Sequence, residues 1–432
     1  MKNVFNPRNV IFIFLCLLLL NCGKKENYQL LPQIGSENLN VTLLQAKRIA
    51  NLEMTNGSVV SKKSTRTSVD SSGSRGISDA KTYRNEKDNS DAFHVINHFK
   101  VDSKTNLKQS AGFTIISADK RIVPILASSE TGRFETENIL KGVDIWVEMV
   151  LNEIKLAKSN LKEPTPTVAY LWEQYDSKPK NGRTTNPYPV CPSGSHTNTG
   201  ILINTTWSQD ATYNLSTPMN GCSSCGRANT GCGPTAIAQV WNYYQKPVSY
   251  PSANGSTYYD YPLAVRKTGD YCDLYTTPIK EMHMAVLLST AGIAAQTNYN
   301  YAGSCSALTW RNDVKTAFIY AGYSNSGQRG GLIDNLTTVN SELINGKPVI
   351  IDGNTSLNFN DWHIWIIDGY DSYTWFTPES NPPYTCIVNS YTKYHLNWGW
   401  EGASDGWYVL YNFVGRGEVY DYALNVTFGM RP

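Results

Sequence analysis

The uneven distribution of charge divides this 432-residue chain into two parts. Residues 23–180 hold 23 basic and 19 acidic side chains, whereas the longer stretch 181–432 holds only 13 basic and 17 acidic ones. Such a change along one chain predicts two separately folding units. The chain is 41% hydrophobic, enough for real cores, and its net charge of +2 forms no basic stripe. These features exclude global disorder and argue against nucleic acid as the main partner.

The N-terminus has the features of an export signal. Two basic residues precede an apolar run at residues 10–20, which would cross only about half of a bilayer as a helix. The Leu-Leu-Asn-Cys sequence ending at Cys22 resembles a bacterial lipoprotein signal, which implies a lipidated Cys22. Asn21 departs from the small residue expected there, and ordinary cleavage nearby is the alternative. We expect a signal at residues 1–22 and a protein of the outer membrane or cell surface, periplasmic or released, that contacts membrane only through a lipid anchor.

The cysteines outside the signal are odd in number. All seven lie in the second part: Cys191, Cys222, Cys225, Cys232, Cys272, Cys305 and Cys386. Because an exported protein can oxidise cysteine pairs, we expect three disulfides and one free thiol. The Cys-Ser-Ser-Cys sequence at residues 222–225 leaves open a redox pair, or a zinc site that adds Cys191 and Cys232. Its glycine-rich loop and the lack of a second such motif favour structural disulfides.

Hydrophobic patterning predicts the elements of each part. In the first part we expect a polar tether at 23–84 with a short helix at 40–51, and then a small α+β domain at 85–180. Its expected strands are at 92–98, 112–116 and 122–127, and its expected helix is at 139–158. Residues 177–195 read as an exposed linker. In the second part, 181–432, we expect helices at 235–245 and 282–292, followed by strands at 348–352, 363–368, 385–389 and 407–411. Helices followed by a sheet predict an α+β hydrolase.

Cys232 is the candidate nucleophile. It precedes Gly233, Pro234 and a run of small and apolar residues with helical spacing. Proline is favoured in the first turn of a helix, so Cys232 is expected at the positive end of a buried helix. There the helix dipole stabilises a thiolate, the reactive form of cysteine. A half-cystine at a helix start is the alternative, but the odd cysteine count favours the nucleophile.

A thiolate nucleophile needs a base, and two histidines begin or precede strand-like segments. His363 opens an apolar run and His395 precedes Leu-Asn-Trp-Gly-Trp. A rigid strand start can hold a catalytic imidazole in one orientation. One of the two is therefore expected to be the base and the other structural, while His283 lies in a predicted helix and is expected to pack.

These motifs resemble the streptopain-like cysteine peptidases, which share a papain-like fold. Thr-Gly-Cys232 with its helix resembles the nucleophile motif, His363-Ile-Trp-Ile-Ile-Asp-Gly the base strand, and the stretch from His395 to Trp407 the last signature. Residues 111–120 resemble the inhibitory prosegment of the family, which implies that the domain at 85–180 is such a prosegment. Gly-Pro after Cys232, the extra cysteines and the long excursion at 372–393 depart from the family pattern.

The resemblance implies a role for each site residue. Cys232 would be the nucleophile, His363 the general base and then acid, and Gln209 the side-chain oxyanion donor. Asn397 would orient the imidazole, with Trp398 shielding that contact, and His395 would be structural.

The sequence thus predicts a two-lobed papain-like α+β endopeptidase made as a zymogen. It would act on proteins or peptides, with its own prosegment as inhibitor and a separate activating protease, and it would need no cofactor or metal. A bacteriocin-processing peptidase is the first alternative, but such enzymes lack the prosegment. A non-catalytic surface adhesin on a peptidase-like fold is the second.

Overall fold

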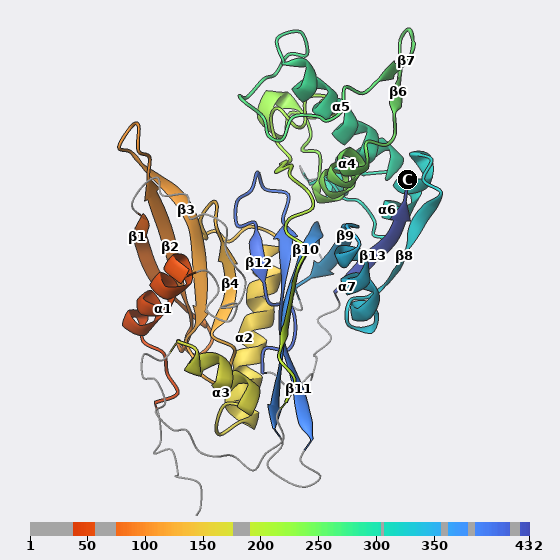
Figure 1. Ribbon diagram of the computed structural model, residues 1–432. Coiled ribbons are helices and arrows are strands. Elements are labelled where there is room, and N and C mark those ends of the chain that lie inside the picture. Colours follow the sequence, from red (N-terminus) through yellow and green to blue (C-terminus); the bar gives the residue numbers. More distant parts are fainter. Residues whose placement is uncertain are drawn as a thin grey trace, which may run out of the picture. The chain divides into compact units, whose positions relative to one another are not determined.

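The structure is a computed structural model that describes residues 38–56, 75–175, 191–303, 306–355, 362–378, 385–414 and 424–432. Residues 39–432 form one compact unit (Figure 1). The expected signal with Cys22, most of the expected linker and Cys305 lie outside the described residues. Among the helices that are described, none combines the length and apolar character needed to span a membrane.

The first part of the chain forms a sheet packed against helices. Its elements are α1 (Leu43–Asn56), β1 (Arg75–Arg84), β2 (Asp91–Val101), β3 (Lys108–Ser117), β4 (Ile125–Ser129), α2 (Val143–Asn160) and α3 (Pro166–Glu173). The three strands and the long helix expected from residue 92 onward correspond to β2, β3, β4 and α2, each shifted by a few residues at its ends.

This domain begins earlier than the expected boundary at residue 85. Within the expected tether, α1 buries Ala46, Ile49 and Ala50 in the core, and β1 pairs along its length with β2. β1 lies at the end of the sheet, is only partly buried, and its register shifts after Ile77. A half-exposed strand with a register shift lacks the apolar alternation that sequence patterning detects, so the tether prediction missed it.

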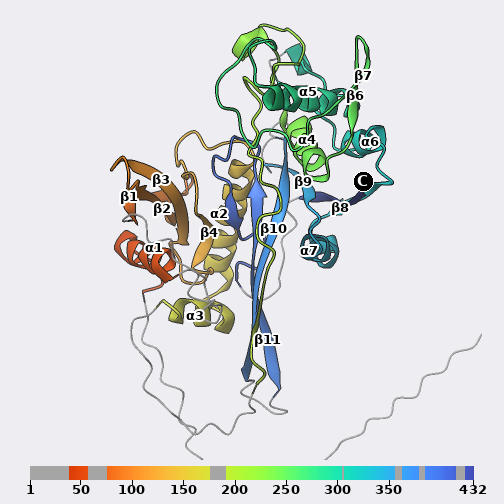
Figure 2. The ribbon, with the colours of Figure 1, turned by 45° about the horizontal axis from the view of Figure 1, so that its top comes forward.

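The second part supplies a helical layer and the rest of the sheet. Its elements are β5 (Ser195–Asn198), α4 (Cys232–Tyr244), β6 (Ser249–Ser252), β7 (Gly255–Tyr258), α5 (Ile279–Ala294), α6 (Asp313–Tyr320), β8 (Asn325–Gly331), α7 (Leu336–Ile344), β9 (Val349–Asn354), β10 (Trp362–Pro378), β11 (Cys386–Asn397), β12 (Gly406–Tyr408) and β13 (Asn425–Arg431). Helices α4 and α5 lie beyond one end of β10, and β10 and β11 form a long hairpin that extends away from them (Figures 1 and 2).

One antiparallel sheet joins the two parts. In the described residues it has 11 strands in the order β1-β2-β3-β4-β12-β11-β10-β9-β13-β8, with β5 paired to β10. The two parts meet at the antiparallel β4–β12 pair, where Ala127 pairs with Tyr408 and Ser128 pairs with Trp407. Helix α2 strengthens it, because the Trp146 indole donates to the Val409 carbonyl at 2.9 Å and its ring packs edge-on against Tyr408. The first domain therefore continues the sheet of the second.

Strand β10 separates two hydrophobic cores. Side chains alternate between the faces of a strand, so Ile364 and Ile366 join the core formed with α4, α5 and α6, while Trp365 and Ile367 join the core shared with the first domain. His363 follows the same alternation as Trp365 and lies on the side of the first domain. The strand thus places the expected base and the expected nucleophile helix on its two faces.

The cysteines form disulfides that connect distant segments. Cys191 pairs with Cys386, Cys225 pairs with Cys272, and Cys222 is also disulfide-bonded. Cys232 is the free cysteine among those described. Since Cys225 is bonded to Cys272 rather than to Cys222, the Cys-Ser-Ser-Cys sequence is neither a redox pair nor part of a thiolate zinc site.

The Cys191–Cys386 disulfide should stabilise the precursor. It closes a loop of 195 residues and ties the chain before β5 to the start of β11. Replacing both cysteines by serine should lower the free energy of unfolding by about 2–4 kcal/mol, because the unfolded chain regains loop entropy. Thermal unfolding of the full-length chain measures the loss, and Val388→Ser at an exposed position of the same hairpin is the control. An unchanged midpoint in the double variant would contradict this role.

Candidate active site

The loop before α4 places Cys232 at the first residue of the helix. Gly231 has φ +90°, and a Cβ there would lie 2.9 Å from the Ala307 Cβ. A Cβ on Gly233 would lie 2.6 Å from Thr309. Glycines on both sides of Cys232 therefore let segment 307–309 pass close to the backbone at the start of the helix.

The Cys232 thiol is only partly exposed, and burial raises its pKa. Hydrogen bonds from the backbone N–H groups of Ile364 and Gly233 oppose this increase without overcoming it. The thiolate expected from the helix dipole is therefore not the resting form here. At neutral pH the group is a thiol, which needs a base before it can react.

His363 is turned toward Trp398. Its Nε2 lies 2.9 Å from the Trp398 carbonyl oxygen, and because a carbonyl only accepts, the neutral ring carries its proton on Nε2. The ring stacks on Trp400 and Trp365, with centroids 5.6 and 5.9 Å away. Burial lowers the pKa of His363 to about 4, and nearby Lys141 adds to the decrease. The imidazole is thus neutral, and its one N–H group donates a hydrogen bond to the Trp398 carbonyl.

The first domain contacts this imidazole through its backbone. A Cβ on Gly142, which has φ +90°, would lie 2.3 Å from the His363 Cδ2 and 3.0 Å from the Trp398 Cε3. The preceding carbonyl, that of Lys141, accepts a hydrogen bond from the Trp400 indole at 2.9 Å. Only glycine fits this position. Sequence patterning placed both residues inside a helix, but α2 begins at Val143, and glycine just before an apolar helix is a recognisable helix-start signal.

Gln209 lies buried near the helix that carries Cys232. Its backbone carbonyl accepts from the Thr230 N–H at 2.9 Å, two residues before Cys232. Its side-chain Nε2 is buried and has no hydrogen-bond partner among the described residues. A buried N–H donor without an acceptor is costly to a fold and often has a functional reason. The group is available to an oxygen that arrives with a ligand.

Asn397 and Trp398 are buried and contact the segments around Cys232 and His363. The Asn397 amide forms a reciprocal pair with Gln239 at 3.2 Å and donates to the Thr205 carbonyl at 2.8 Å. Trp398 is fully buried and packs on Trp365. In this arrangement the contact with His363 comes from the Trp398 carbonyl, and the Asn397 side chain is engaged elsewhere.

His395 belongs to a buried charged group on the next strand. Its Nδ1 lies 2.6 Å from the Asp368 carboxylate. Burial opposes protonation of His395, but the nearby Asp368 carboxylate outweighs it and raises the pKa of the ring. Burial raises the pKa of Asp405 to about 7, and this carboxyl accepts from the Trp398 N–H at 2.8 Å. His395 is therefore engaged with partners other than Cys232.

Comparison with known proteins matches both parts of the chain. Residues 207–408 match the Peptidase C10 family, and residues 39–154 match the Spi protease inhibitor. Streptopain of Streptococcus pyogenes serotype M1 is 25% identical over 336 residues, which cover 70% of this chain and 72% of streptopain. The thiol protease/hemagglutinin PrtT of Porphyromonas gingivalis is 20% identical over 332 residues, which are 73% of this chain and 34% of PrtT.

The fold agrees with these matches. The structure of prointerpain A from Prevotella intermedia superposes with a TM-score of 0.50 at 20% identity, covering 82% of this chain and 99% of that one. The expected papain-like α+β fold with a preceding prosegment is confirmed. The chain is thus a cysteine peptidase that carries a Peptidase C10 (streptopain-like) domain at residues 207–408, preceded by a Spi protease inhibitor domain at residues 39–154.

Proposed function

We propose that the chain is an exported endopeptidase precursor that uses Cys232 and His363 as a thiolate–imidazolium pair, held inactive until the first domain is released. The observation that carries the proposal is the approach of the Gly142 backbone to His363. While Gly142 lies on the ring and the Nε2–H group donates to the Trp398 carbonyl, the imidazole is held in this orientation and cannot turn toward Cys232 to act as its base. Release of the domain would free the ring to turn toward the thiol.

The reaction of the released enzyme follows from these groups. His363 removes the proton of the Cys232 thiol, and the thiolate attacks the carbonyl carbon of the scissile peptide bond. The negative charge that develops on the carbonyl oxygen is stabilised by the Gln209 Nε2 and the Cys232 backbone N–H. The imidazolium of His363 then protonates the leaving amine, and water activated by the same ring hydrolyses the thioester. In this scheme Asn397 orients the freed imidazole and Trp398 covers their contact.

The residues that flank segment 176–190, Tyr175 and Cys191, are both held by contacts within the structure. On one side Tyr175 is buried, and its hydroxyl donates to Glu53 of α1 at 2.6 Å. On the other side Cys191 is bonded to Cys386. We propose that an activating protease cuts between about residues 175 and 192. After the cut, the Tyr175 contact would remain within the inhibitor and the disulfide within the catalytic domain, while the shared sheet still joins the two, so cleavage and activation are separate steps.

Export through residues 1–22, with lipidation at Cys22, belongs to the same proposal. It is supported by the apolar run and by the disulfides, since such bonds persist in oxidising compartments. Globomycin, an inhibitor of lipoprotein signal cleavage, should cause the larger precursor to accumulate if Cys22 is lipidated. Processing that is insensitive to the drug would indicate ordinary signal cleavage.

The roles of the three groups can be separated by substitution. In the trimmed enzyme, Cys232→Ala and His363→Ala should each reduce peptide hydrolysis by several orders of magnitude, because one removes the nucleophile and the other its base. His395→Ala should mainly lower the melting temperature, because it breaks the buried contact with Asp368. Hydrolysis of a fluorogenic peptide and labelling by a thiol-directed epoxide such as E-64 measure the effects. An inactive His395→Ala enzyme beside an active His363→Ala enzyme would reverse the assignment.

The inhibitory contact can be tested at Gly142. The uncut precursor should be inactive and the trimmed enzyme active, with the new N-terminus found by sequencing. Gly142→Ala should raise the activity of the uncut precursor, since its Cβ would overlap His363 and force the segment off the ring. Gly255→Ala is the matched control, because Gly255 also has a positive φ but nothing within 4 Å of its Cβ. A precursor as active as the trimmed enzyme would refute the zymogen proposal and leave the first domain as a docking module.

Acid should weaken the docked arrangement through His363. The pKa of the ring is lowered by burial from 6.5 to about 4, so the docked form is fully stable above pH 6.5 and loses stability as the pH falls toward 4. Nearby Lys141 opposes protonation in the same direction. The melting temperature of a full-length Cys232→Ala precursor should therefore fall more steeply over this range than that of a Cys232→Ala/His363→Gln precursor. Parallel curves for the two proteins would show that His363 is not the titrating group.

A further inference from the structure

Residues 264–272 of the catalytic domain run beside the backbone that carries Gln209 and are hydrogen-bonded to it before and after this residue. We define residues 206–213 as the Gln209 loop and residues 264–272 as the strap. Five hydrogen bonds connect them near the ends of the loop: Trp207 Nε1 to the Ala264 carbonyl at 2.8 Å, Thr206 N to the Val265 carbonyl at 3.0 Å, Thr212 Oγ1 to the Gly269 carbonyl at 2.7 Å, Tyr271 N to Thr212 Oγ1 at 2.8 Å, and Lys267 N to the Tyr213 hydroxyl at 3.3 Å. These bonds fix the two ends of the loop and leave its middle to another contact.

Lys267 supplies that contact. Its Nζ donates to the Ala211 carbonyl, two residues beyond Gln209, and lies 3.7 Å from the Asp210 carboxylate. The side chain is 12% exposed. Asp270 at 2.8 Å and Glu401 at 3.6 Å hold the ammonium in place. One cation thus connects the middle of the Gln209 loop to the strap.

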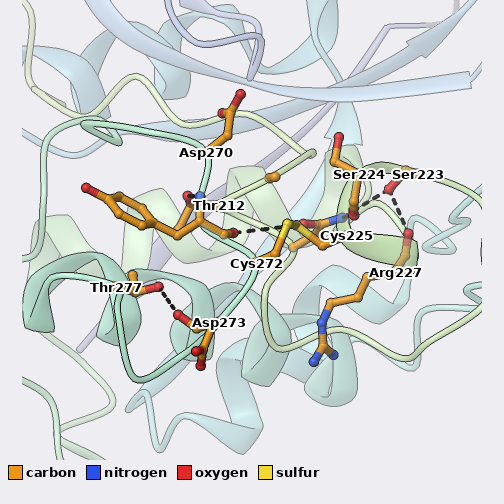
Figure 3. The surroundings of a disulfide bond; sticks show 12 residues. Thr212, Ser223, Ser224, Cys225, Arg227, Asp270, Cys272, Asp273 and Thr277 are labelled. Carbon is orange, nitrogen blue, oxygen red and sulfur yellow. Dashed lines mark hydrogen bonds between the residues drawn. A yellow bond between two sulfur atoms is a disulfide. The ribbon is translucent and has the colours of Figure 1, made fainter.

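The strap is itself covalently fastened. The disulfide between Cys272 at its end and Cys225 joins it to the loop that leads into α4 (Figure 3). Thr212 of the Gln209 loop bonds to Gly269 and Tyr271 of the strap, just before this disulfide in the chain (Figure 3). Lys267 therefore connects the Gln209 loop to a segment that has a fixed attachment near the nucleophile helix.

The unpartnered Gln209 amide makes this connection important. Since its Nε2 has no protein acceptor, no side-chain hydrogen bond from that nitrogen fixes its direction. The direction then depends on the backbone, which is held on one side by the Thr230 N–H on the Gln209 carbonyl and on the other by Lys267 on the Ala211 carbonyl. Oxyanion donors act only within a few tenths of an ångström of the right position, and a displacement of about 1 Å can cost about 100-fold in rate.

We propose that Lys267 is a positioning residue for peptide hydrolysis, which holds the backbone at residues 210–211 so that the Gln209 amide points at the developing oxyanion. This inference rests on the proposed role of Gln209. Lys267 acts through the loop and contacts no reacting atom. Its effect is on kcat, through stabilisation of the oxyanion, and the nucleophilicity of Cys232 is unchanged.

The test uses the full-length chain activated by trimming. Lys267→Met should lower kcat about 10- to 100-fold with KM within about twofold, because the amide contributes in the transition state more than in substrate binding. The pH profile and the rate of Cys232 alkylation by iodoacetamide should be unchanged, since alkylation forms no oxyanion. Lys267→Arg should restore most of kcat. Arg266→Ala is the matched control, because this neighbour is bonded to Glu401 but not to the Gln209 loop.

A double-mutant cycle separates this inference from the proposed function. Gln209→Ala alone should cost about 10²–10³ in kcat. If Lys267 acts through Gln209, adding Lys267→Met to Gln209→Ala should change kcat by less than about threefold. If Gln209→Ala leaves kcat intact, the oxyanion assignment fails and the inference fails with it. If Gln209→Ala lowers kcat but Lys267→Met does not, or if the two losses multiply, the inference alone is overturned.

Folding defects are controlled by a second substitution. Lys267→Gln removes the charge and shortens the reach to Ala211 with a smaller change in chemistry than methionine. The melting temperature of each precursor is measured before activation. If Lys267→Met does not accumulate folded, the same cycle is run with Lys267→Gln. A reduced kcat with a shifted pH profile or slower alkylation of Cys232 would show an electrostatic effect on the thiol and would overturn the positioning role.

Discussion

The contact of the Gly142 backbone with the His363 ring is the interaction on which the proposed control of the site by the first domain depends. For a main chain to lie on an imidazole, the residue must lack a Cβ and adopt a positive φ, and Gly142 meets both conditions. Helix α2 starts at the next residue, and its Trp146 is bonded to the backbone that follows β12. The proposed inhibitory contact is thus made at the start of a helix that packs in the core shared by the two parts.

The same arrangement explains why both reactive groups are neutral. Burial raises the pKa of Cys232 and lowers the pKa of His363, so each group favours its uncharged form. A thiolate–imidazolium pair requires the opposite change in both pKa values, which mutual contact would provide once the ring turns. The first domain therefore does more than cover the site. In the proposed mechanism it holds the ring where its Nε2–H group donates to the Trp398 carbonyl, which keeps the two groups from stabilising each other's charge.

The sequence predicted the catalytic half of the structure better than its inhibitory contacts. Helix α4 and strand β10 were found because buried segments have strong apolar patterns, and Cys232 was singled out because the cysteine count is odd. The start of the first domain was missed because β1 is half exposed and irregular. Disulfide partners and the approach of Gly142 to His363 depend on which distant segments meet, and local patterning carries no information on that.

The β4–β12 pair has a consequence for the enzyme after it loses its inhibitor. Strand β12 lies between β4 and β11 in the precursor. If β4 left, β12 would become an edge strand with unpaired backbone N–H and C=O groups. The ring of Tyr408, now covered by Trp146, would be uncovered with it. Exposed edge strands favour self-association, because they can pair with a strand of another chain. At three residues, Gly406–Tyr408 is too short to be a good template for another chain, which suits a peptidase that must stay dispersed once it is free.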